Sequence, residues 1–163
     1  MNILIEDRKF ILSEVTEEMY EDCVRFLNDD EIKKHFYSNK VDELNIESFV
    51  KKLDIAKDKK IIVFTIYENN NNELGNFIGM AKISKYPPAP FFISIAIKKE
   101  FRRKGYGSHL LSKLCRYVQI GYNQSKVCMN CFSTDNDSYK FIIENGFELF
   151  DNSFGLCYFR KHL

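Results

Sequence analysis

The spacing of apolar residues changes along the chain between a strand-like and a helix-like period, and these changes predict most of the elements. Strands are expected where β-branched, aromatic and aliphatic residues run together between polar or glycine-rich segments. The predicted strands are Lys9–Val15, Ile61–Tyr67, Phe77–Ser84, Phe92–Lys98, Lys126–Phe132 and Phe147–Arg160, the last being a strand pair or one long bent strand. The second and third should form a hairpin across an exposed, mobile loop that holds the four asparagines Asn69–Asn72. Lys85–Pro90 contains three prolines and is expected to connect two strands.

Helices are predicted where apolar residues recur three and four positions apart. The stripes are Met19-Cys23-Phe26-Leu27 after a candidate N-cap at Thr16, Ile46-Phe49-Val50-Leu53, and Leu110-Leu111-Leu114-Cys115-Val118. Shorter helices are expected over residues 30–36 and Asp135–Asn145. Two glycines are expected to end helices, Gly121 the long one and Gly146 the last one.

The order of these elements predicts a mixed α/β (α+β) sheet flanked by helices. A chain of 163 residues, 45% of them hydrophobic, has enough apolar material for one core, and no linker interrupts it. We therefore expect a single domain over residues 1–163.

Charge and cysteine content narrow the function classes. Lys and Arg number 24 against 23 Asp and Glu, so no overall field favours nucleic acid or an anionic membrane as a partner. No apolar run has the length of a membrane span, and the first residues lack the features of a signal peptide, so we expect a cytoplasmic protein. The five scattered cysteines are typical of reduced core thiols. Cys128 and Cys131 have half-zinc-site spacing without a second ligand pair, so no metal site is predicted.

The segment from Ile93 to Ser108 carries the clearest chemical signal, because a strand leads through a basic, glycine-containing turn into a helix. Unpaired N–H groups at a helix start bind anions, and Gly105 and Gly107 permit close approach. Arg102, Arg103 and Lys104 add positive charge. A dinucleotide fingerprint would need glycine where Leu110 stands, and no Walker loop occurs in the chain. The turn therefore predicts a phosphate site of another kind.

Arg102, Gly105 and Gly107 match the pattern of Arg or Gln, two residues, Gly, one residue, then Gly or Ala. Together with the helix segment that ends in Gly146-Phe147, this pattern resembles the GNAT superfamily of acetyl-CoA-dependent N-acetyltransferases. Asp29-Asp30-Glu31-Ile32 and Ser48-Phe49 look more like the branch that includes ribosomal-protein N-terminal acetyltransferases. The resemblance implies a central, mostly antiparallel sheet. Within it the strand holding Ile95 and Ile97 separates from the strand holding Val127 to Cys131.

The resemblance also implies how the protein would work. Acetyl-CoA would place its pantetheine arm in the gap between the separating strands, and a primary amine of a small molecule or of a peptide or protein N-terminus would attack directly. Backbone N–H groups near Ile95 to Ile97 would stabilise the oxyanion. The implied cofactor-binding residues are Ile95, Ala96, Ile97, Arg102, Arg103, Lys104, Gly105, Tyr106, Gly107, Ser108, Asp135, Asn136 and Ser138.

The catalytic groups depart from the family pattern. The strand glutamate of many members falls in Phe91-Phe92-Ile93, and the tyrosine that protonates the leaving thiolate falls at Ile142. Tyr139, three residues earlier, is the remaining candidate acid, with a packing role as the alternative, and no general base is identified. His109 either approaches the cofactor or is a solvated helix residue. The alternative to an enzyme is an inactive acyl-CoA-binding module; the acceptor and the oligomeric state are not indicated.

Overall fold

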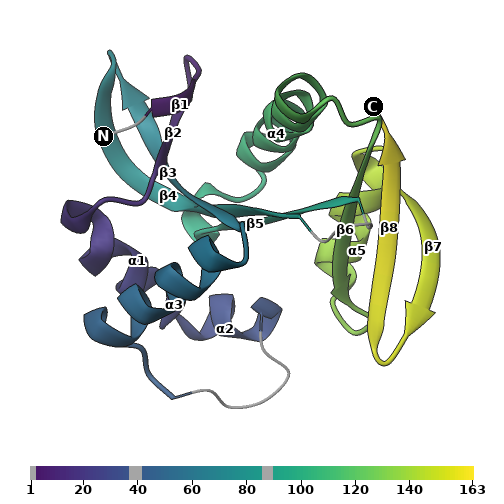
Figure 1. Cartoon of the computed structure of the whole chain (residues 1–163), viewed down its shortest axis with the longest axis horizontal. Helices are drawn as coiled ribbons and strands as arrows, with labels where there is room; N and C mark the ends of the chain where they lie inside the picture. The colour runs from purple at the N-terminus through teal and green to yellow at the C-terminus, as the bar shows by residue number, and fades with distance from the viewer. Residues whose placement is uncertain (1–2, 37–41, 86–89) are drawn as a thin grey trace.

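A single eight-stranded sheet organises this computed structural model, which describes residues 3–36, 42–85 and 90–163 (Figure 1). The strands lie in the order β1-β2-β3-β4-β5-β6-β8-β7. Their bounds are Ile3–Glu6, Phe10–Glu14, Ile62–Asn70, Glu73–Ser84, Phe91–Ile97, Lys126–Phe132, Glu148–Ser153 and Leu156–His162 for β1 to β8. Every neighbouring pair is antiparallel except β5 and β6, which are parallel. The mixed, mostly antiparallel sheet is confirmed.

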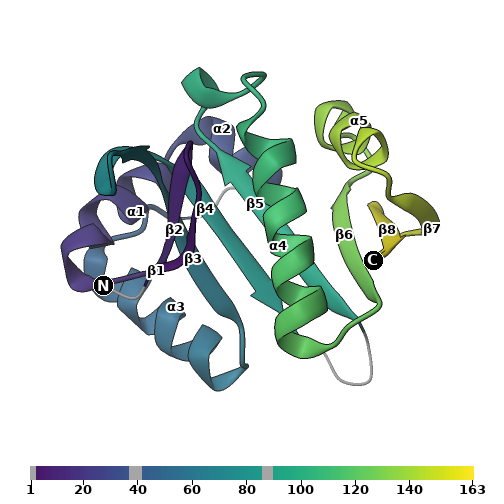
Figure 2. The ribbon, with the colours of Figure 1, turned by 90° about the horizontal axis from the view of Figure 1, so that it is seen from above.

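Helices cover both faces of the sheet (Figures 1 and 2). They are α1 Tyr20–Leu27, α2 Asp30–Phe36, α3 Ile46–Asp58, α4 Tyr106–Tyr122 and α5 Asn136–Glu144, with single 3₁₀ turns at Glu17–Met19 and Lys99–Phe101. On one face Met19, Phe26 and Phe49 pack beneath β3, β4 and β5. On the other, the predicted stripe of α4 packs with Phe64, Ile93 and Phe159 in the larger core. The helix periodicity therefore identified the buried faces.

Two local predictions are wrong, and a third is confirmed only in position. Thr16 occupies the N-cap position of the 3₁₀ turn Glu17–Met19, but its hydroxyl donates to Glu18 (3.1 Å) and caps no backbone N–H. The expected asparagine loop is only the two-residue turn Asn71-Asn72, with φ of 56° and 70°, because asparagine tolerates the left-handed region. Gly121 lies inside α4; Asn123, at φ 50°, caps the helix. Residues 86–89 of the predicted proline connection lie outside the described residues.

One further difference is β1, which was not predicted. Of the two alternatives for Phe147–Arg160, the strand pair is confirmed: it is the hairpin β7–β8, which turns at Phe154 and Gly155. Gly146, at φ 82°, follows α5 as expected.

All five cysteines are free and buried, which confirms them as core residues. Among the described residues no helix is both long and apolar enough to cross a membrane.

The parallel pair β5–β6 separates soon after it begins. Its register contains only Phe91 opposite Val127 and Phe92 opposite Cys128, so from Ile93 onward β5 has no partner strand on this edge among the described residues. On its other edge β5 stays paired with β4 as far as Ile97. The expected splayed strand pair is therefore present, and it leaves one backbone edge of β5 open inside the sheet.

Asp7, in the turn between β1 and β2, ties this hairpin to α4. Its carboxylate lies 3.0 Å from His109 Nε2 and 3.0 Å from Lys113 Nζ, and its side chain is 12% exposed. Burial alone would raise the pKa of Asp7. The hydrogen bonds from His109 and Lys113, with that of the Lys9 N–H, outweigh burial and hold the pKa well below its ordinary value. The ionised form therefore stabilises the fold.

Asp7→Asn is expected to lower the free energy of unfolding by about 1–3 kcal/mol at pH 7, because Lys113 loses its counter-charge and the neutral amide oxygen is a weaker acceptor for both His109 and Lys113. A depressed folded-state pKa contributes stability above the unfolded value of about 4, and this contribution is lost as pH falls toward the folded value. The difference between wild type and variant in urea unfolding should therefore shrink below about pH 4. Glu47→Gln, at an exposed ion pair with Lys51, is the control and should change stability by less than about 0.5 kcal/mol. An equal effect of the two variants would contradict the assignment.

Candidate functional site

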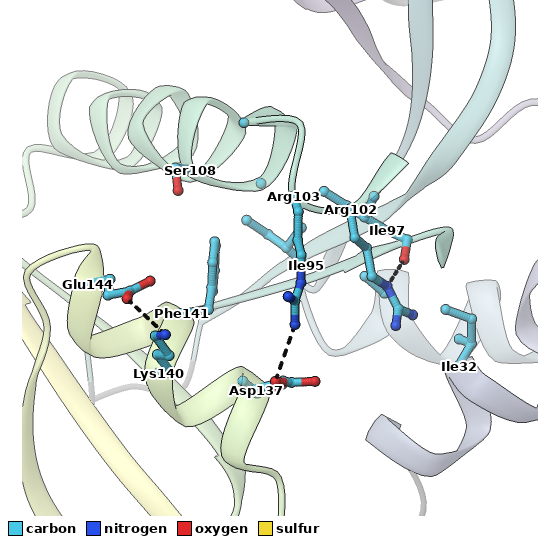
Figure 3. Close-up of a pocket in the computed structure, with 14 residues that line it drawn as sticks. Ile32, Ile95, Ile97, Arg102, Arg103, Ser108, Asp137, Lys140, Phe141 and Glu144 are labelled. Atoms are coloured by element: carbon cyan, nitrogen blue, oxygen red, sulfur yellow. Dashed lines mark hydrogen bonds and ion pairs between the residues drawn. The ribbon is translucent and has the colours of Figure 1, made fainter. Parts of the chain in front are cut away.

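A cavity of about 500 Å³ opens where β5 and β6 separate, between the start of α4 and α5 (Figure 3). Three elements form its walls. β5 contributes Ile95, Ala96 and Ile97; the turn and α4 contribute Arg102, Arg103, Gly105, Gly107 and Ser108; α5 contributes Asp137, Ser138, Lys140, Phe141 and Glu144. Ile32 of α2 closes one end. Residues distant in sequence therefore meet at the open edge of the sheet.

The start of α4 is open toward this cavity. Gly105 adopts φ 82°, and a Cβ placed on it would meet no atom within 4 Å. No side chain caps this end of α4, and the first backbone bond into the helix runs from His109 N to Gly105 O. The N–H groups of residues 106–108 therefore lack intrahelical partners, as at any helix start. Together with the helix dipole they form a site for an anion.

Gly107 has a different role from Gly105. A Cβ at Gly107 would lie 3.1 Å from Phe141 Cε2 and 3.5 Å from Ile97 Cδ1. The missing side chain lets the Phe141 ring of α5 pack directly against the first turn of α4, as Figure 3 shows. One glycine thus keeps the anion site accessible, while the other sets the width of the cavity.

The backbone of β5 presents hydrogen-bonding groups to the cavity. The Lys98 N–H donates to Ile78 O of β4 (2.9 Å). Because neighbouring residues of a strand direct their polar groups to opposite edges, Ile97 and Ile95 direct theirs away from β4, into the gap. The Ile97 carbonyl accepts a hydrogen bond from Arg102 Nε (2.8 Å). The N–H groups of Ile95 and Ile97 and the carbonyl of Ile95 therefore face the space in which an extended ligand would pair with β5.

Two ion pairs lie in the cavity lining, one between opposite walls and one along α5. Arg103, a non-glycine residue at φ 58°, directs Nη2 to within 4.0 Å of Asp137 Oδ1 on α5. Lys140 Nζ lies 3.7 Å from Glu144 Oε1 one turn along α5. All four side chains are largely exposed. Such pairs contribute little to stability, so these cations can exchange their carboxylate partners for a bound anion at little cost.

Five of the predicted site residues lie outside the cavity lining. Lys104 extends over the Phe101 ring. The Tyr106 hydroxyl donates to Glu68 (3.1 Å), and burial together with this carboxylate raises the tyrosine pKa. The other three are on α5: Asp135 caps the helix by accepting from Ser138 N and Oγ, Asn136 is not part of the lining, and the Tyr139 ring packs on Phe159.

The remaining predicted residues converge on the cavity: Ile95, Ala96, Ile97, Arg102, Arg103, Gly105, Gly107, Ser108 and Ser138. Five lining residues were not predicted: Ile32 of α2 and, on α5, Asp137, Lys140, Phe141 and Glu144. The spacing of 137, 141 and 144 indicates one face of a helix, but only the fold shows that this face lines the cavity. His109 contacts Asp7 and does not approach the cavity.

Solved structures with the same fold were found across nearly the whole chain. A domain from Methanocaldococcus jannaschii superposes with a TM-score of 0.81 at 19% identity, covering 96% of this chain and 100% of that one. Spermidine N-acetyltransferase from Vibrio cholerae, in complex with CoA and spermine, gives 0.75 at 14% identity, covering 96% of each chain. Ribosomal-protein-S5-alanine acetyltransferase from Vibrio fischeri gives 0.74 at 11% identity, covering 97% and 95%.

Sequence comparison gives the family directly. A search of curated proteins finds no significant match. The family described as Acetyltransferase (GNAT) domain matches residues 9–148, which includes β2 to α5 and hence the open edge of β5, the glycine turn and the cavity. The anion site beside a splayed strand pair, the shared fold and this match lead to one conclusion: the chain belongs to the GNAT family of acetyltransferases.

Proposed function

We propose that this protein transfers the acetyl group of acetyl-CoA to a primary amine, either of a small molecule or of a peptide or protein N-terminus. The observation that carries the proposal is the uncapped start of α4, with Gly105 open to the cavity, directly beside the unpaired edge of β5. The open start of α4 can bind a pyrophosphate through its N–H groups. The unpaired edge of β5 can hydrogen-bond an arm that contains amides.

The residues present fit acetyl-CoA along the whole cavity. The N–H groups of residues 106–108 would hold the pyrophosphate, with Arg103 and Lys140 able to supply charge from opposite walls. The polar groups of Ile95 and Ile97 would hydrogen-bond the pantetheine amides as an added strand does. When bound, acetyl-CoA supplies an activated acyl thioester. The N–H groups that β5 directs into the gap would donate to the acyl oxygen and orient it.

Among the described residues, the cavity lining holds no buried carboxylate to act as a base. Its two acids, Asp137 and Glu144, are 87% and 62% exposed and are paired with cations. Phe91 is buried, and so is Ile142 at 1% exposure, so neither family position supplies a proton donor or acceptor. An alkyl amine with a pKa of about 10.4 would then have to lose its proton to water before attack.

Acetyl-CoA thioester consumption should therefore be measured with polyamines and with alanine-terminated peptides, since proteins of similar fold act on spermidine and on a ribosomal-protein alanine. We expect turnover with at least one amine. With polyamines, whose amines have pKa values of about 10, we also expect kcat/KM to rise about tenfold per pH unit between pH 7 and 9, because only the free amine reacts; with a peptide α-amino group, of pKa about 7.7–8.0, the rise should level off near pH 8. A flat profile in this range would indicate an internal base and contradict the proton route.

The second candidate is a non-catalytic acyl-CoA-binding module. Its supporting observation is the burial of Ile142 and the apolar segment Phe91–Ile93 where family members carry proton-transfer groups. Micromolar binding of acetyl-CoA without turnover across the amine panel would favour this module. Steady turnover with any one amine would remove it, and absence of acetyl-CoA binding would contradict both functions.

A further inference from the structure

Arg102, the first residue of the glycine turn pattern, does not extend toward the anion site. Its Nε donates to the Ile97 carbonyl at 2.8 Å, and its Nη1 lies 3.8 Å from Glu31 Oε2 on α2. Figure 3 shows the guanidinium directed toward Ile32 and α2, whereas Arg103 points to α5. The Arg102 side chain is 32% exposed, about a third of the exposure of Arg103 at 89%. Arg102 therefore lies between the end of β5 and α2.

α2 has few other anchors in the described part of the chain. It has seven residues, and Ile32 is the buried one among its described side chains, at 3% exposure. Ile32 packs in the smaller core with Ala96 and also lines the cavity. A small shift of α2 would therefore move one wall of the cavity. Arg102 supplies a polar contact beside Ile32, the buried apolar residue among the described side chains of α2.

Glu31 is a suitable partner for this contact. A hydrogen bond from Lys34, followed by the charges of Lys34, Lys99 and Arg102, holds the pKa of Glu31 below its ordinary value. The carboxylate is therefore ionised at neutral pH. Lys34 Nζ contacts Oε1 at 3.1 Å, which leaves Oε2 to Arg102. An arginine can donate to the Ile97 carbonyl through Nε and face the carboxylate with Nη1 at once, whereas the three donors of lysine are on one nitrogen and reach two separated acceptors less well.

We infer that Arg102 is a positioning residue that holds α2, and with it the Ile32 wall of the cavity, against the end of β5, and that it does not bind the cofactor phosphate. The inference rests on the proposed function, because it takes the cavity to be the binding site of acetyl-CoA. It assigns the phosphate to the backbone of residues 106–108 and to Arg103. Through Arg102, the glycine turn at the cofactor side of the cavity is also in contact with α2 at the opposite side.

The test uses two measurements on the full-length protein. Hydrogen exchange of the α2 amides is followed by mass spectrometry in the absence of ligand, and acetyl-CoA binding is measured by titration calorimetry. Arg102→Lys and Glu31→Gln should each speed the hydrogen exchange of the α2 amides at least about threefold. Because both substitutions remove the same Arg102–Glu31 contact, the double variant should exceed the larger single effect only slightly. The acetyl-CoA Kd should stay within about threefold of wild type in all three.

Two controls separate this role from general effects. Lys34→Gln removes the other partner of Glu31 and should leave the effect of Arg102→Lys on α2 exchange intact. Arg103→Gln should weaken acetyl-CoA binding by about 3- to 10-fold with α2 exchange unchanged, because its side chain faces the anion site. With an amine that the wild type acetylates, Arg102→Lys should raise KM for the amine while KM for acetyl-CoA stays constant, a split that simple loss of folded protein would not produce.

The opposite results would overturn the inference. If Arg102→Lys weakens acetyl-CoA binding more than about tenfold and leaves α2 exchange unchanged, Arg102 is a phosphate ligand. If Glu31→Gln does not affect α2 exchange, the contact with α2 has no positioning role. If the wild type fails to bind acetyl-CoA, the proposed function fails instead, while the exchange measurements still decide whether Arg102 holds α2.

Discussion

Gly105→Val is expected to abolish detectable acetyl-CoA binding while the protein remains folded. Gly105 lines the cavity at the start of α4 with φ 82°, and a Cβ placed on it would meet no atom within 4 Å. A valine would place methyl groups where the pyrophosphate must approach the N–H groups of residues 106–108. We expect at least a 100-fold loss of affinity, about 2.8 kcal/mol at 1.4 kcal/mol per tenfold change, measured by titration calorimetry.

Gly155→Val is the matched control. Gly155 adopts φ 75° in the turn between β7 and β8, and a Cβ there also meets no atom within 4 Å. Both variants therefore carry the same kind of backbone strain, roughly 1–2 kcal/mol, but only one lies at the cavity. Gly155→Val should lower the thermal midpoint as much as Gly105→Val does and keep wild-type affinity. Equal affinity of the two variants would contradict the anion site.

Gly79→Ala is expected to have the largest effect on stability. Gly79 lies on β4 opposite Ile97, and a Cβ there would come within 2.1 Å of the Ala96 carbonyl oxygen. A backbone atom held in a sheet cannot move aside as a side chain can, so β5 would have to shift. We expect a loss of roughly 2–3 kcal/mol in the free energy of unfolding. Because Ala96 and Ile97 line the cavity, acetyl-CoA binding should weaken as well.

Gly121→Ala is the control for this substitution. Gly121 lies within α4, where an added Cβ meets nothing within 4 Å and φ is ordinary, so alanine should stabilise the protein by about 0.4–1 kcal/mol. Urea unfolding of the two variants and the wild type gives both values. If Gly79→Ala leaves the free energy of unfolding unchanged, β4 and β5 can separate locally without cost. The close approach of Gly79 to the Ala96 carbonyl would then not hold the open edge of β5 in place.

Local chemistry made parts of the site predictable. The basic turn between β5 and α4 was recognisable because a strand, two glycines and a helix start follow one another in sequence, and the resulting anion site uses backbone N–H groups of consecutive residues. Gly146 as the end of α5 was equally local, because the residue after a helix often needs a positive φ. The apolar stripe of α4 fixed its buried face.

Side-chain destinations were not predictable in the same way. Tyr106 and Lys104 stand in the turn pattern, but their side chains go to Glu68 and Phe101. Tyr139 faces Phe159, and Asp135 is occupied as a helix cap. Each of these outcomes depends on which partner lies nearest in space, and several partners are distant in sequence. The motif therefore indicated where the turn lies along the chain, whereas the contacts of these side chains depended on the tertiary structure.

The sequence by itself determined most of the element types, the mixed sheet, the family resemblance and the position of the glycine-containing turn before α4, because these depend on periodicity and on contiguous backbone groups. Only the tertiary structure decided that α5 contributes a full wall of the cavity, that Gly79 admits the Ala96 carbonyl, and that Arg102 turns to Ile97 and Glu31. These features arise where elements far apart in the chain pack together. There the conformation of lowest free energy depends on how the side chains fit and which partners they meet, and not on local propensity.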